Sequence, residues 1–308
     1  MRIGTRSFFD QMSATVTRLQ TQLGDLNVSM SSGKRVSKPS DDPLDAVLVA
    51  QVNTELSTAK TRAEVLSGGV AMLREADGAL SQISDALQGA IQSASTSLQA
   101  TSQGQSQLAA CAVEIRSYAQ SILTAANTKS GDRYLFGGYQ DRQTPFVGGA
   151  LSTTYAGDSN QMTVPLGNGR TCPIAVPGDQ VLNYKNSSGT RAVDAVDADV
   201  FTALESLACA VETGDSGAVR QRLDDMQALR SNVVQLRGAV GSWDVRLQAS
   251  QDALEDARLR YQEILADRES IDLAAGVTEY AAQETAYKAT LSVLGQILQL
   301  PTLFDLTG

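Results

Sequence analysis

The fold is decided by FDQMSATVTRLQTQLGDLNVSM at residues 9–30 and by LAAGVTEYAAQETAYKATLSVLGQIL at residues 273–298. In both stretches apolar side chains recur after three or four residues, which is the spacing of a helix that packs lengthwise against other helices. Only Glu284 interrupts the second series. We predict that both series are assembly surfaces, formed by Phe9, Met12, Val16, Leu19, Leu23, Leu26, Met30, Leu273, Val277, Tyr280, Tyr287, Leu291, Leu294 and Leu298.

The composition is that of an ordered, acidic protein. Of the 308 residues 42% are apolar, and the formal net charge is -9 with an isoelectric point of about 4.6. That charge repels nucleic acids, and no stretch comes near the ~18 apolar residues of a membrane helix. We therefore expect protein partners, with no nucleic acid and no membrane. The start of the chain lacks the apolar segment of a cleaved signal peptide, so we expect any secretion to use another route.

Catalytic and metal-binding chemistry has little support in the sequence. The chain has no histidine, the commonest general base and metal ligand, and Cys111, Cys172 and Cys209 are scattered. Gly167 and Gly169 lack the third glycine of a dinucleotide-binding loop, and a hairpin turn explains them better. We expect no enzymatic activity, no cofactor and no metal ion.

A helix-breaking segment follows the first series and ends in a helix start. A glycine, prolines and serines interrupt residues 31–43. Asp42 is placed to cap the first free amides of a helix, and Pro43 suits the first helical position. A calcium or carboxylate cluster at the Asp41-Asp42 pair is the alternative, but a turn followed by a cap explains both residues. The predicted turn and cap consists of Pro39, Ser40, Asp41, Asp42 and Pro43.

The order of helical and β-type patterns divides the chain into five segments. An N-terminal assembly helix with its linker occupies 1–40, and a long helical arm occupies 41–130. A β-rich insert follows at 131–196, where short alternating runs lie between glycines and prolines. A returning helical arm at 197–269 leads to a C-terminal assembly helix at 270–308. We predict a mainly α fold: a long helical hairpin or coiled-coil rod with both termini at one pole and the insert at the other.

A cluster of aromatic residues and glycines marks the point where the first arm meets the insert. The segment Tyr134-Leu135-Phe136-Gly137-Gly138-Tyr139 holds three aromatic side chains, although the whole chain is only 5% aromatic. We predict a hydrophobic clasp that closes the end of the helical arm, formed by Tyr134, Leu135, Phe136, Gly137 and Gly138.

These segments together resemble the flagellin superfamily of bacterial flagellar proteins. The resemblance rests on the two terminal series, on Ser32-Gly33-Lys34-Arg35-Val36 through Pro43, and on Ser130 through Tyr139. Within the superfamily, three features resemble the proteins that form the junction between hook and filament. These features are the opening Met1-Arg2-Ile3, the continuation to Thr144-Pro145-Phe146, and the ending Leu303-Phe304-Asp305-Leu306. The resemblance covers both helical arms, whereas residues 140–195 match no motif that we can place.

The resemblance implies a flagellin-like structural protein, secreted through the channel of the flagellum itself without signal cleavage. It implies an extracellular position at the junction of hook and filament, in a ring layer made of copies of this chain. The other implied partners are the first hook-associated protein on the hook side, flagellin on the filament side and an export chaperone.

Two alternative functions remain open. The chain could be the flagellin of the filament itself, although the short insert and the segment from Tyr134 to Phe146 argue against this. It could also be a secreted coiled-coil interaction module, which explains the helices but not the combination of motifs.

Overall fold

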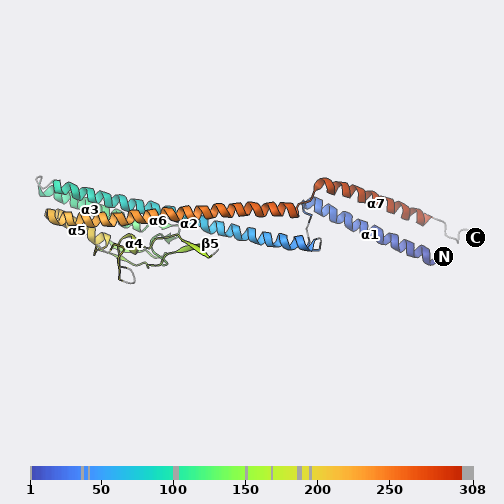
Figure 1. Ribbon diagram of the computed structural model, residues 1–308, viewed down its shortest axis with the longest axis horizontal. Helices are drawn as coiled ribbons and strands as arrows, with labels where there is room; N and C mark the ends of the chain where they lie inside the picture. The colour runs from blue at the N-terminus through green and yellow to red at the C-terminus, as the bar shows by residue number, and fades with distance from the viewer. Residues whose placement is uncertain are drawn as a thin grey trace, which may run out of the picture. The chain divides into compact units, whose positions relative to one another are not determined.

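The computed structural model describes residues 2–35, 38–40, 42–99, 104–149, 152–167, 169–185, 189–193 and 196–299, and for 2–9 and 297–299 it describes the backbone alone. The described chain is mainly helical, as the sequence predicts. None of its helices combines the length and hydropathy needed to cross a membrane. The long helices are α1 Arg2–Ser32, α2 Pro43–Gln99, α3 Gln105–Ala126, α5 Val200–Thr213, α6 Ser216–Glu269 and α7 Leu273–Gln299 (Figure 1).

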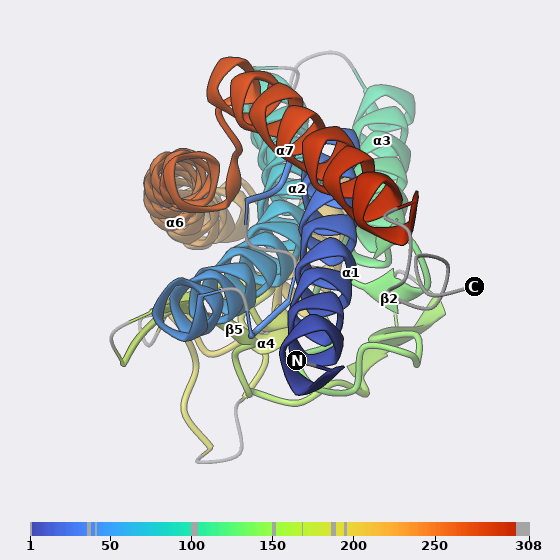
Figure 2. The same cartoon turned by 90° about the vertical axis from the view of Figure 1, so that its right-hand side faces the viewer.

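The chain forms two compact units, which we call the terminal unit and the central unit. The terminal unit joins Met1–Lys60 to Asp256–Gly308, and the central unit is Thr61–Glu255. In the terminal unit α1 and α7 lie side by side (Figures 1 and 2). They run antiparallel, because the end of α1 lies beside the beginning of α7.

The start of α2 follows from its first residues. The Asp42 carboxylate accepts hydrogen bonds from the backbone N–H groups of Leu44 and Asp45, each at 3.2 Å. Pro43 needs no such partner because it carries no N–H. Pro39 and Ser40 lie in the preceding exposed turn, and Asp41 lies outside the described residues.

The first helical arm is interrupted at Gly104, where the sequence predicts one long arm over 41–130. Gly104 has a φ of 99°, a backbone conformation that only glycine adopts at little cost. After it, α3 runs back along α2. Ser93 of α2 therefore donates to the Glu114 carboxylate of α3, and the ring of Tyr118 lies against Gly89.

The core of the central unit is built from the inward faces of α2, α3, α5 and α6. Residues on these faces recur at helical spacing, and their side chains are buried. An ion pair links α2 to α6 beside this core, with Arg237 Nε 3.0 Å from Asp77 Oδ1. The largest apolar side chains of the helical core include Leu66, Leu73, Leu80, Ile83, Leu87, Ile115, Ile122 and Phe201.

Between α3 and α5 the described residues form three antiparallel two-stranded sheets and the short helix α4 Gly178–Val181, so the first strand begins two residues before the predicted insert. Gly167 and Gly169 lie at the turn of the third sheet with φ angles of 100° and 73°, in keeping with the predicted hairpin turn. The strands are β1 Lys129–Ser130, β2 Arg133–Tyr134, β3 Phe146–Gly149, β4 Ser152–Tyr155, β5 Thr163–Gly167 and β6 Arg170–Pro173.

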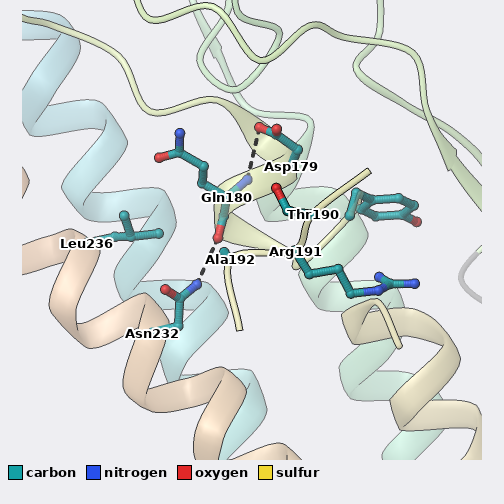
Figure 3. Close-up of a pocket in the computed structure, with 8 residues that line it drawn as sticks. Asp179, Gln180, Thr190, Arg191, Ala192, Asn232 and Leu236 are labelled. Atoms are coloured by element: carbon teal, nitrogen blue, oxygen red, sulfur yellow. Dashed lines mark hydrogen bonds between the residues drawn. The ribbon is translucent and has the colours of Figure 1, made fainter. Parts of the chain in front are cut away.

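The insert lies alongside α2 and α6 within the central unit. A Cβ on Gly69 of α2 would stand 3.0 Å from Ile174 of the insert. The Asn232 side chain of α6 donates to the Gln180 carbonyl of α4 at 2.7 Å, on the wall of a cavity of about 290 Å³ (Figure 3). The insert therefore packs along the helices of this unit, because the turn at Gly104 reverses the chain and α3 carries it back before the insert begins. That the insert and the chain ends lie at opposite poles stays a prediction.

Candidate assembly site

The first apolar series forms the α7-facing side of α1. Six of its members are half-buried, although α7 is the one helix that packs against α1 in this pair. They are Met12, Val16, Leu19, Leu23, Leu26 and Met30. Phe9 belongs to the predicted series, but its side chain lies outside the described residues. A two-helix pair can cover only one side of each helix, so these side chains stay partly open to solvent.

The second series divides into two stripes on α7. Tyr280, Tyr287 and Leu294 are spaced seven residues apart and are half-buried. Leu273, Val277 and Leu291 instead remain 55%, 54% and 41% exposed, and we call these three residues the exposed stripe. Fully burying one such side chain stabilises by about 1.5–3 kcal/mol. The exposed stripe is therefore an apolar surface that the terminal unit does not itself cover.

Glu284 lies in line with the exposed stripe, seven residues from both Val277 and Leu291. Its carboxylate pairs with Lys288 one turn later at 2.7 Å, so the charge is balanced within the helix. Leu298 continues the same line, but its side chain lies outside the described residues.

A polar group inside the helix pair also lacks a partner. The carbonyl oxygen of the Gln283 side chain is buried and accepts no hydrogen bond from the described residues. The amide nitrogen of the same side chain donates to Glu279 at 3.3 Å. A buried acceptor without a donor costs about 1–3 kcal/mol. A donor from outside the pair would remove that cost.

The linkers that follow α1 and α6 are joined to each other. Lys34 and Ser270 form an antiparallel β-bridge, which we call the linker bridge. Two backbone hydrogen bonds flank it, from Arg35 N–H to the Glu269 carbonyl at 2.7 Å and from Ile271 N–H to the Gly33 carbonyl at 3.1 Å.

Asp45 is the centre of the charges around the linker bridge. Its carboxylate pairs with Arg35 and, at 3.7 Å, with Arg268, and its side chain is only 16% exposed. Arg35 also lies 3.5 Å from Asp42, and Lys34 pairs with Glu269. These pairs are not among the predictions from the sequence. The sequence does place two groups of opposite charge close together, Lys34-Arg35 and Asp42 to Asp45, but the contribution of Arg268 and Glu269 depends on tertiary structure.

The helix cap lowers the pKa of Asp42 below its ordinary value of 3.8. The largest cause is the hydrogen bond from the Asp45 N–H, and the neighbouring Arg35 acts in the same direction, while partial desolvation opposes them. A lowered folded-state pKa contributes stability that is present above the unfolded-state value and is lost as the pH falls through the folded-state value. Acid below pH 3.8 is therefore expected to weaken the start of α2.

Asp45→Asn is expected to open the linker bridge, because two guanidinium groups would then face each other without a carboxylate between them. We expect the amide hydrogens of Arg35 and Ile271 to exchange several-fold faster at neutral pH. The matched control is Asp25→Asn, which removes an exposed pair with Lys38 at 3.7 Å that should contribute little. Equal exchange rates in the wild type and in Asp45→Asn would show that the charges do not hold the bridge.

The predicted clasp lies in the central unit, in and after β2. Tyr134 belongs to β2 and its hydroxyl lies 2.9 Å from that of Thr144. Leu135 and Phe136 are 1% and 0% exposed. Gly137 and Gly138 follow at a close backbone approach: a Cβ would stand 2.9 Å from the Gln140 carbonyl oxygen and 2.1 Å from the Asp158 carboxylate, respectively.

Among the described residues, no group of three or more His, Cys, Asp or Glu side chains could hold a metal ion. The three cysteines are free thiols, with Cys111 and Cys172 buried and Cys209 exposed. The sequence-predicted residues that the structure brings together are the described members of the two terminal series, which lie in one helix pair. The cap and the clasp belong to different units and are described separately.

The chain is similar to known proteins of the bacterial flagellum. The model of the bacterial flagellin N-terminal helical region matches residues 3–141. Flagellar hook-associated protein 3 of Escherichia coli (strain K12) is 26% identical over 323 residues, which cover 100% of this chain and 100% of that protein.

Solved structures share the fold at low sequence identity. Flagellar hook associated protein-3 from Legionella pneumophila aligns with a TM-score of 0.60 at 13% identity, over 72% of this chain and 98% of that one. The flagellar junction protein FlgL from Legionella pneumophila aligns with a TM-score of 0.56 at 12% identity, over 73% of this chain and 100% of that one. The chain is thus similar along its whole length to flagellar hook-associated protein 3, and its N-terminal part is similar to the helical region of bacterial flagellins.

Proposed function

We propose that this chain is a structural protein of the bacterial flagellum that forms the junction layer between hook and filament. The observation that carries the proposal is the exposed stripe on α7, which leaves a helix pair of the terminal unit incompletely covered. A relative along the whole chain bears the name of a hook-associated protein, and one of the solved structures is described as a flagellar junction protein.

The proposed partners follow from that position. Copies of the chain form the ring layer, and their terminal helices complete each other's apolar surfaces. The first hook-associated protein lies on the hook side and flagellin on the filament side. An export chaperone covers the terminal helices before secretion through the flagellar channel, and the assembled protein is extracellular. The partly covered helix pair supports this, because such helices can unfold for transport and be stabilised again by burial against neighbours.

The filament flagellin is the second candidate, and the match of residues 3–141 to the flagellin N-terminal region favours it. The two candidates place the protein differently: a junction protein occupies one short band, whereas a flagellin occupies the whole filament.

Immunogold labelling of whole cells tests the proposal. We expect gold at a single band where the hook meets the filament, and we expect deletion of the gene to release unpolymerised flagellin into the medium while hooks remain. Labelling along the full filament would contradict the junction proposal and support the flagellin alternative.

A further inference from the structure

A hollow of about 310 Å³ lies where the β5–β6 hairpin meets α6 in the central unit. On α6 the lining residues share one helix face, because they are three or four positions apart. Four of the seven lining residues, Gly167, Ala249, Ser250 and Ala253, are small. The lining residues are Leu166, Gly167, Arg170, Arg246, Ala249, Ser250 and Ala253.

Three arginines from three different elements converge on this hollow, which we call the arginine hollow. Arg170 of β6 and Arg246 of α6 line it. Arg62 of α2 lies next to the lining residue Gly167, since its Nη1 is 4.0 Å from the position that a Cβ on Gly167 would take. All three side chains belong to exposed residues.

Within the described residues these three arginines have no ion-pair partner. Elsewhere in the same unit, arginines that approach other elements are paired: Arg237 with Asp77 at 3.0 Å, and Arg116 with Glu205 at 3.0 Å. The whole chain has 34 acidic against 25 basic residues, so carboxylates are not scarce. Like charges gathered without a counter-charge repel one another, and a bound anion would remove that repulsion.

We propose that the arginine hollow binds neighbouring Asp and Glu side chains on a segment of a partner protein. Guanidinium groups present planar pairs of donors that match carboxylates, and such charge-assisted bonds are roughly twice as strong as neutral ones. The small lining residues Ala249, Ser250 and Ala253 leave room for side chains to enter. Leu166 offers an apolar surface to the methylene groups of a glutamate.

The charge of the whole molecule favours a local acidic segment over a long polyanion. At -9 the protein repels nucleic acid and other extended polyanions. Attraction is confined to the short range over which the three guanidinium groups act, about 8–10 Å at moderate salt. A short acidic peptide segment fits that range.

The test uses the full-length protein and a short fluorescein-labelled peptide of alternating Glu and Ala, with binding followed by fluorescence anisotropy at low salt. We expect salt-sensitive binding that weakens about tenfold or more, roughly 1.4 kcal/mol, when Arg62→Gln, Arg170→Gln and Arg246→Gln are combined. The matched control combines Arg142→Gln, Lys185→Gln and Arg220→Gln. It removes the same charge from exposed residues of the same unit that also lack a described ion pair. We expect the control to bind like the wild type.

Three results would overturn the proposal. The first is that the wild type does not bind the peptide at low salt, and the second is that both triple variants lose peptide affinity equally. The third is that inorganic polyphosphate displaces the labelled peptide at a lower concentration than unlabelled peptide does, when both concentrations are counted per negative charge. The last would identify a phosphate site. Because all six substitutions are at exposed side chains, circular dichroism and thermal unfolding should match the wild type in both variants.

Discussion

A chain that carries both Val277→Asp and Leu291→Asp should fold and yet fail to assemble. Both side chains are already about half in water, at 54% and 41% exposure, so the isolated terminal unit should tolerate the change. In an assembled layer the same positions would be buried against a neighbour, where an unpaired carboxylate costs several kcal/mol. The expected result is loss of motility and of filament attachment in a deletion strain complemented with this variant. Its thermal unfolding should stay close to that of the wild type.

The control for this variant is Thr278→Asp combined with Thr285→Asp. It adds the same charge to the same helix at two exposed positions about a quarter turn round from the exposed stripe. Thr and Asp have similar helix propensities, as do Val and Asp, so both double variants change helix stability little. We expect the control to restore motility. Motility restored equally by both variants would show that the exposed stripe is not an assembly surface.

The period of the apolar residues predicts the terminal helices but not which of their faces is covered. In the second series every member satisfies a heptad pattern, yet Tyr280 is half-buried and Val277 is exposed. The two positions lie only about 60° apart on the helix, since each residue advances by roughly 100°. One neighbouring helix covers one of them and leaves the other open. The sequence cannot distinguish them, because the distinction depends on how many helices surround α7.

Local chemistry was predictable from the sequence and long-range pairing was not. The Asp42 cap and the Gly167–Gly169 turn depend on residues close in sequence, and both patterns predict what the structure has. The sequence does not distinguish the turn at Gly104 from the glycines inside the helical arm, because a single glycine also fits inside a helix at a cost of about 1 kcal/mol. The ion pair of Arg268 with Asp45 joins residues more than two hundred positions apart, for which a single sequence offers no pattern.

Phe136→Ala is expected to lower the free energy of unfolding of the central unit by about 3–5 kcal/mol, the usual loss for a buried aromatic ring. Phe136 is fully buried, and its carbonyl accepts the Gly178 N–H at 2.9 Å and lies 2.9 Å from the Tyr155 hydroxyl. These bonds hold the backbone in place, so the surroundings cannot collapse into the space that the ring leaves. A large residual cavity places the loss near the upper part of that range.

Tyr139→Ala is the matched control, three residues later in the same motif. Its side chain is 62% exposed, so its removal should change stability by no more than about 0.5 kcal/mol. Urea unfolding followed by circular dichroism separates the two variants. A loss below about 1 kcal/mol for Phe136→Ala would mean that the clasp does not close the helical arm. If the large loss is found and the terminal helix pair keeps its amide exchange rates, the clasp stabilises the central unit alone, and assembly through the exposed stripe is an independent property of the terminal unit.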